Sequence, residues 1–249
     1  MIITSDISSL YPTAIINYRA IRFKEVLQRY IDIRSERLIA KKEKDKMKDS
    51  FLKLCLNSFS GLLDNEYSWL YYPEGIMKVR CGGQLILLEL TDRLLENGFT
   101  PISLNTDGIE VRLKRSELDK YYQIISEIEK SHNLLFEHDT YSKIVYQNVN
   151  SYIAITESGK VKEKGMFVRK PELGNSTDFL IIPNMLYDYF VSGIPPEKSI
   201  YNYNDIYLFC ASQKVDKTYT VEWNNKPQQR LNRYYASNKG AYLYKCRGV

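Results

Sequence analysis

The feature that most constrains this chain is a long stretch, residues 19–50, that contains neither glycine nor proline. It holds 11 basic and six acidic residues, and a run without either helix breaker favours helix. A turn within KKEKDKMKD (41–49) would divide the stretch into two antiparallel helices. The second helix continues through FLKLCLNSF (51–59) and should end at Gly61, a residue type common just past a helix end. We therefore expect a basic helical arm.

Short apolar segments on either side of the arm predict the elements of a core. A strand should run from residue 2 to about Asp6, because Pro12 would interrupt a longer one. The spacing of apolar residues from Gly83 to Leu94 predicts a helix that stops at Asn97-Gly98. This helix should pack on a sheet.

The next segment predicts a hairpin and a further helix. Alternating apolar residues between Ile102 and Leu113 flank NTDG (105–108), which would place Asp107 at the apex of the hairpin. Ser116 and Asp119 have the spacing of a capping box, and the apolar face of the following helix would contain Leu118, Tyr122, Ile125 and Ile128. Strand, helix, hairpin and helix together predict an α+β fold. Beyond about residue 165 the periodicity weakens, which indicates a separate and incomplete subdomain.

Composition disfavours several classes of protein. No run approaches the ~18 apolar residues that span a bilayer, and the acid within MIITSDISSL is atypical of a signal peptide, so no membrane partner is expected. Four scattered cysteines form no CxxC pair, so they are expected to be cytoplasmic thiols. With only two histidines, metal chemistry would depend on carboxylates, which are ligands of Mg²⁺ or Mn²⁺.

Asp6 and Asp107 are the acids that could carry such chemistry. Each also has an ordinary explanation, Asp6 as a capping residue at a strand end and Asp107 as part of a hairpin turn. Their combination with the basic arm favours phosphate chemistry, because Lys53 and Asn57 are four residues apart and share one helix face. Two rigid carboxylates can bind two Mg²⁺ ions about 3.5–4 Å apart, which clamp the attacking and leaving oxygens of a displacement.

A turn directly after the first strand could supply donors to phosphate. Backbone N–H groups of Ser8, Ser9 and Leu10 would act in the same way as helix ends and backbone nests that bind anions.

Three segments now carry a family resemblance: DISSLYPT (6–13), KLCLNSFSG (53–61) and LNTDGIEV (104–111). In this order they resemble motifs A, B and C of the family B DNA polymerases. KEKGMF (162–167) also resembles the palm-to-thumb passage of phage members, so the resemblance covers roughly residues 1–165. It implies an antiparallel palm sheet with packed helices, a helical fingers insertion and a partial thumb-like subdomain.

The resemblance implies boundaries and an activity. Residues 1–18 and 65–165 would form the palm, 19–64 the fingers, and 166–249 the thumb-like subdomain. The activity implied is template-directed DNA synthesis, which transfers deoxynucleotidyl groups from dNTPs to a primer 3′-hydroxyl with two Mg²⁺ ions.

Individual roles follow by resemblance. Asp6 and Asp107 would be the catalytic, metal-binding aspartates, and the Ile7 carbonyl would help to hold one ion. Tyr11 would be the steric gate under the sugar that favours deoxyribonucleotides. Lys53 would contact the incoming triphosphate, with Asn57 beside it.

Further contacts are expected around these motifs. Three cations of the first arm helix would add triphosphate contacts: Arg34, Arg37 and Lys41. Tyr152 and Lys164 would lie near the primer end. A C-terminal surface that interleaves cations and tyrosines, including Arg233, Tyr234 and Lys239, would hold the primer–template backbone, although half-buried strands would give the same pattern.

The sequence departs from the family pattern at three places. Asn105 replaces an aspartate of motif C, Ser60 replaces the tyrosine before the motif B glycine, and Asn150 replaces the lysine of a Lys-x-Tyr element. These changes motivate an alternative, a degenerate palm that binds DNA or a replication partner without catalysis. A reverse transcriptase is a rival enzyme, against which Tyr11 and Lys53 argue. The arm alone could also be a solvated helical face.

The family's proofreading exonuclease precedes motif A, whereas five residues precede Asp6 here. We therefore expect a fragment of a longer polymerase, or a split gene product whose partner supplies that portion. The expected partners are primer–template DNA, dNTPs and other replication proteins, in the cytoplasm of a bacterial host if the gene is viral.

Overall fold

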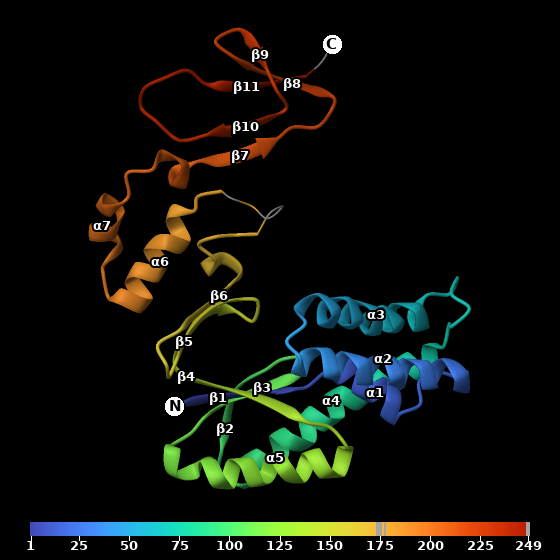
Figure 1. Cartoon of the computed structure of the whole chain (residues 1–249). Coiled ribbons are helices and arrows are strands. Elements are labelled where there is room, and N and C mark those ends of the chain that lie inside the picture. Colours follow the sequence, from blue (N-terminus) through green and yellow to red (C-terminus); the bar gives the residue numbers. More distant parts are fainter. Residues whose placement is uncertain (173–175, 177, 248–249) are drawn as a thin grey trace. The chain divides into compact units, whose positions relative to one another are not determined.

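The computed structural model describes residues 1–172, 176 and 178–247. It divides into two compact units, Met1–Ser142 and Lys143–Val249, each with helices and antiparallel strands (Figure 1). The division falls inside β4 (Phe136–Asn148) and does not test the subdivisions expected at residues 18, 64 and 165, which stay predictions. Among the helices described, none has the length and apolar character needed to cross a membrane.

The first unit contains an antiparallel sheet in the order β2-β3-β1-β4. Its strands are β1 (Ile2–Ile7), β2 (Thr100–Leu104), β3 (Gly108–Arg112) and the first part of β4. In β1, Ile3, Ser5 and Ile7 are buried and Asp6 is exposed, as alternation in a half-buried strand requires. The predicted strand near Asp6 and the predicted hairpin are therefore confirmed.

Two helices cover one face of this sheet, α4 (Pro73–Glu96) and α5 (Leu118–His132) (Figure 1). A continuous core joins them to the strands and includes Ile3, Ile7, Leu87, Leu90, Leu94, Ile109, Val111, Ile125 and Ile128. Helix α4 ends where predicted, because Gly98 adopts a left-handed φ of 86° directly after the Asn97 cap. Its beginning, at Pro73, is ten residues earlier than the apolar pattern from Gly83 indicated.

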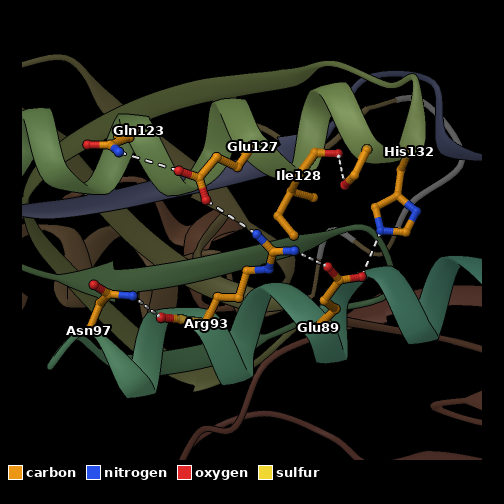
Figure 2. Close-up of polar contacts among 8 residues, drawn as sticks. Glu89, Arg93, Asn97, Gln123, Glu127, Ile128 and His132 are labelled. Carbon is orange, nitrogen blue, oxygen red and sulfur yellow. Dashed lines mark hydrogen bonds and ion pairs between the residues drawn. The ribbon is translucent and has the colours of Figure 1, made fainter.

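Polar contacts at the edge of this core join α4 to α5 (Figure 2). Arg93 of α4 donates to Glu89 at 2.8 Å and to Glu127 of α5 at 3.3 Å. His132 at the end of α5 contacts Glu89 at 2.8 Å, and this contact is the main cause that lowers the pKa of Glu89. The two helices are thus linked by charge as well as by apolar packing.

The helical arm consists of α2 (Lys24–Lys42) and α3 (Lys46–Asp64), preceded by α1 (Leu10–Asn17). The predicted turn within 41–49 is confirmed. A second core cluster includes Ile15, Ile21, Tyr30, Leu56, Leu63, Ile76 and Val79. Burial raises the pKa of Tyr30, whose hydroxyl donates to the Leu56 carbonyl at 3.1 Å.

Two predictions about helix ends and one about a helix face are wrong. Gly61 does not end α3, because Leu63 continues the helix into the second core cluster. The capping contact before α5 joins the Lys114 N–H to Glu117 at 2.7 Å rather than Ser116 to Asp119. The buried tyrosine of α5 is Tyr121, not Tyr122, because Tyr121 packs edge-on against Phe99.

The second unit has its own small elements. β5 (Ser151–Thr156) pairs with β6 (Val161–Lys164), and further strands form the pair β7–β10 and the sheet β11-β8-β9. The bounds are β7 Ala211–Lys214, β8 Tyr219–Trp223, β9 Lys226–Gln228, β10 Leu231–Tyr234 and β11 Leu243–Arg247. Asp188 of α6 (Ile181–Ser192) accepts hydrogen bonds from Tyr203, at 2.8 Å, and from Ser199 at the end of α7 (Pro196–Ser199).

Candidate functional site

Asp6 lies in β1, and Asp107 lies in the turn directly before β3, the strand that pairs with β1. Asp6 pairs with Gly108 across β1 and β3, and the Ile7 N–H donates to the Asp107 carbonyl at 2.6 Å. Both side chains are exposed, and Asp107 occupies the turn between β2 and β3. Two acids a hundred positions apart in sequence are therefore neighbours along the backbone hydrogen-bond ladder.

Gly108 makes room for the Asp6 side chain. A Cβ atom at Gly108 would overlap Oδ1 of Asp6, so a residue with a side chain would force the carboxylate to move. Because the backbone conformation at Gly108 is ordinary for a strand, this glycine is required by close approach and not by its dihedral angles.

The opposite face of β1 is fixed by a buried polar contact. Ser5 is fully buried, and its hydroxyl lies 2.6 Å from the Tyr121 hydroxyl and 2.7 Å from Nδ1 of His138. Burial raises the pKa of Tyr121 to about 12 and lowers that of His138, so both groups are held neutral. These contacts hold β1 in place from the face of the sheet opposite to the Asp6 side chain.

The segment after β1 collects the cations expected on the first arm helix. Arg37 donates to Ser9 Oγ at 3.0 Å and to Asp49 at 2.9 Å, and Arg34 donates to Thr13 Oγ1 at 3.1 Å. Ser9 has a left-handed φ of 53° and precedes the first turn of α1. The structure thus brings Arg34 and Arg37 to the turn that contains Ser8, Ser9 and Leu10.

Lys41 reaches the same turn through an acid that sequence reasoning did not identify. Its Nζ lies 2.7 Å from Oε1 of Glu137 in β4, and Ser8 Oγ donates to the same oxygen at 2.8 Å. Lys41, followed by Ser8, lowers the pKa of Glu137. A signal for Glu137 was absent because its partners lie 96 and 129 positions away.

On α3, the two residues expected near the triphosphate share one exposed face. Lys53 and Asn57 are exposed on one side of the helix, whereas Leu52 and Leu56 are buried on the other. The expected common face of Lys53 and Asn57 is confirmed. The hydroxyl of Ser60, which stands at the tyrosine position of the family motif, donates to the Asn57 carbonyl at 2.7 Å.

A cavity of about 150 Å³ adjoins the turn and is lined by Leu10, Tyr11, Val79, Arg80, Gln84 and Thr106. Tyr11 therefore borders an open space. Arg80 and Gln84 of α4 were not predicted, and Arg80 is paired with Asp64 at 2.7 Å. The cavity alone is smaller than the ~300 Å³ at which ligand pockets begin.

Asn105, which stands where motif C of the family has an aspartate, makes hydrogen bonds within the turn before β3. Asn105 Oδ1 accepts from the Thr106 N–H at 2.8 Å, and the Asn105 N–H donates to the Gly108 carbonyl at 2.9 Å. Asn105 therefore shapes the turn that presents Asp107. In the part of the chain described, no three or more His, Cys, Asp or Glu side chains are grouped so as to hold a metal ion.

The remaining predicted contacts belong to the second unit. Tyr152 pairs with Lys164 across β5 and β6, and the Lys164 ammonium lies 5.7 Å from the Tyr152 ring centroid. Arg233 and Tyr234 lie in β10, opposite Ser212 and Ala211, and Lys239 follows in an exposed segment. Their proposed roles on DNA stay predictions.

Comparison with known proteins gives one kind of match. Neither a protein-family model nor a curated protein sequence matches the chain. The structure is similar to the family B DNA polymerase from the hyperthermophilic archaeon Pyrobaculum calidifontis, with a TM-score of 0.56 and 16% sequence identity. The match covers 87% of this chain and 35% of that chain, so this chain spans about a third of its length. The fold is thus a mixed one, with helices and antiparallel sheets, that resembles part of a family B DNA polymerase.

Proposed function

We propose that this chain catalyses template-directed DNA synthesis, in which dNTPs donate deoxynucleotidyl groups to a primer 3′-hydroxyl. The observation that carries the proposal is the backbone pairing of the Asp6 and Asp107 segments, beside a turn that α2 supplies with cations. The fold similarity to part of a family B DNA polymerase supports it. The viral type of the resemblance and the bacterial host cytoplasm are part of this proposal.

Oxygen donors at the site suit Mg²⁺, or Mn²⁺ in its place. Asp6 and Asp107 offer exposed carboxylates, and the Ile7 carbonyl would add a third oxygen. Two such ions, when bound, would stabilise the charge on the attacking and leaving oxygens. Gly108 leaves the space in which the Asp6 carboxylate turns toward the site.

The chain's own donors would bind the triphosphate. Of the backbone donors expected in the turn, the Ser8 N–H already donates to the Leu135 carbonyl at 2.7 Å, so the N–H groups of Ser9 and Leu10 at the start of α1 would bind phosphate. Arg34, Arg37 and Lys41 would add positive charge from α2. On α3, Lys53 would add a further charge, and the Asn57 amide would add a neutral hydrogen-bond donor. The ring of Tyr11 at the adjoining cavity would exclude a 2′-hydroxyl.

The second unit would hold the primer–template. Tyr152 and Lys164 would contact the primer strand, and Arg233, Tyr234 and Lys239 would contact backbone phosphates. Such contacts position DNA without reading its sequence. Other replication proteins are the further partners that we propose.

The test is Mg²⁺-dependent primer extension by the chain on a DNA template. Asp107→Asn should lower the rate at least about a hundredfold, because it removes a charge that the transition state requires. Asp92→Asn, at an exposed position of α4, is the matched control and should leave the rate unchanged. Extension that survives Asp107→Asn would contradict the proposal. Preference for an RNA template would favour the reverse transcriptase rival.

A second function is favoured by Asn105 and Ser60. In this alternative the chain is a degenerate palm that binds DNA or a replication partner without catalysis. Salt-dependent DNA binding, unchanged by Asp107→Asn and without nucleotide incorporation in Mg²⁺, would establish it. Incorporation that Asp107→Asn abolishes would exclude it.

A further inference from the structure

Glu137 lies beside the proposed catalytic acid. It pairs directly with Asp6 across β1 and β4, so both side chains stand on the same face of the sheet. Gly108 is the partner of Asp6 on the other side, in β3. Of the two residues paired with Asp6, Glu137 is therefore the one that has a side chain.

The Glu137 carboxylate collects donors of the kind that bind phosphate. Ser8 Oγ and Lys41 Nζ both point to the single oxygen Oε1, at 2.8 and 2.7 Å. The donors come from the turn after β1 and from α2, and the acceptor comes from β4. An incoming phosphate oxygen would need the same hydroxyl and the same ammonium.

Charge around the turn opposes a bare polyanion. The three cations Arg34, Arg37 and Lys41 lie beside this turn, and Asp49 and Glu137 pair with two of them. Two further carboxylates follow along the sheet, Asp6 opposite Glu137 and Asp107 next to the Ile7 N–H. Glu137 neutralises Lys41, and Asp49 does the same for Arg37. Cations bound by Asp6 and Asp107 would reverse this balance.

We propose that Glu137 is a specificity-determining residue that makes triphosphate binding depend on bound divalent cations. It does so by competing with phosphate for Lys41 and Ser8. The inference rests on the proposed function, because it assigns the triphosphate to this turn. Without divalent cations, the Glu137 carboxylate keeps its contact with Lys41. With divalent cations bound, the triphosphate displaces the Glu137 carboxylate from Lys41.

The test measures the dissociation constant of inorganic triphosphate for the full chain by calorimetry, in EDTA and in Mg²⁺. Glu137→Gln should tighten binding in EDTA about fivefold, the effect of one unit charge about 4 Å from a phosphate in water. The dissociation constant in Mg²⁺ should change less, so the ratio of the dissociation constant in EDTA to that in Mg²⁺ should fall. The side chains of Lys41 and Glu137 are 53% and 59% exposed, so the variant should fold.

A cycle with Lys41→Met identifies the mechanism. Lys41→Met should weaken binding, and Glu137→Gln should have a smaller effect in its background, because one of the two donors for which Glu137 competes is gone and only Ser8 is left. Glu96→Gln and Lys42→Met, at exposed positions, are the controls and should leave the ratio unchanged. Weaker or unchanged binding by Glu137→Gln in EDTA, or an equal effect without Lys41, would overturn the inference.

The two proposals fail separately. A chain that binds triphosphate in this pattern but extends no primer would contradict DNA synthesis and leave the role of Glu137 intact. A chain that extends primers with an unaltered ratio for Glu137→Gln would do the reverse. A chain that binds no triphosphate even in Mg²⁺ would overturn the inference about Glu137.

Discussion

The two units of the molecule differ in how they are stabilised. In the described residues, both large hydrophobic clusters lie within Met1–Ser142 and join its sheet to the surrounding helices. The second unit buries fewer side chains, mainly Ile153, Ala154, Phe167, Ile181, Cys210, Ala211, Val215 and Val221. It relies more on exposed contacts between cations and tyrosines, such as Lys164 with Tyr152 and Lys245 with Tyr219.

This difference agrees with the functions that we propose for the two units, catalysis in the first and DNA binding in the second. Acids that share metal ions must be held to a fraction of an ångström, which a continuous core provides. Contacts with DNA phosphates tolerate looser placement, because they depend on charge more than on precise distance. Changes in the first unit should therefore act on stability or chemistry, and changes in the second on affinity for DNA.

The largest expected effect is on the first core. Leu90→Ala should lower the free energy of unfolding by about 2–5 kcal/mol, because Leu90 is fully buried between α4 and the sheet. Leu231→Ala in β10, where the side chain is 53% exposed, should cost less than about 0.5 kcal/mol. Urea unfolding measures both, and equal losses would break the comparison.

A single methyl group tests the precision of the site. Gly108→Ala should reduce primer extension about tenfold to a hundredfold, since the new Cβ would displace the Asp6 carboxylate. DNA affinity should be unchanged, because the contacts that we propose for DNA lie in the second unit. Normal extension by this variant would show that the close approach of Gly108 to Asp6 is not needed.

A cation of the second unit should affect DNA alone. Lys164→Met should leave the free energy of unfolding within about 0.5 kcal/mol, because a cation and a ring at an exposed position contribute little. The slope of log affinity against log salt should fall by about 0.9 if one duplex phosphate contact is lost. Fluorescence anisotropy at several salt concentrations gives the slope, and an unchanged slope would remove Lys164 from the interface.

The smallest effect is a pH dependence of the first unit. Burial lowers the pKa of His138 below its ordinary value of 6.5, so the unfolded chain binds this proton more readily than the folded chain. The free energy of unfolding should therefore fall as the pH drops through about 6.5 and level off below the folded pKa. His138→Gln should flatten this part of the curve, and a curve identical to the wild type would contradict the assignment.

The sequence predicted those elements whose signals are local. Alternation located β1 and the β2–β3 hairpin, and the absence of glycine and proline located the arm. The end of α3 was mispredicted because Leu63 packs against residues that follow it, an interaction that outweighs the signal of Gly61. Tyr121 was overlooked in favour of Tyr122 because its partners, Ser5 and Phe99, are distant in sequence.

The candidate site was predictable only in part, for the same reason. The motifs indicated Asp6 and Asp107, which the structure brings to adjoining positions, and the basic arm indicated Arg37, which contacts Ser9. No local pattern linked Lys41 to Glu137 across 96 positions. Arg80 and Gln84 were missed because they line the cavity from a helix whose spacing indicated only its packing face.

Gly61 remains as an unfilled position on α3. It stands in the last turn of α3 (Lys46–Asp64), and a glycine inside a helix costs up to about 1 kcal/mol relative to alanine. Apart from its chain neighbours and the backbone of its own helix, no described atom lies within 4 Å of where its Cβ would stand, so no packing contact of the described residues requires a glycine here. Because Gly61 has no side chain, another molecule can approach the α3 backbone here more closely, by the size of a methyl group, than it could at an alanine. Gly61→Ala should therefore give a more stable helix but leave less room for another molecule against the α3 backbone.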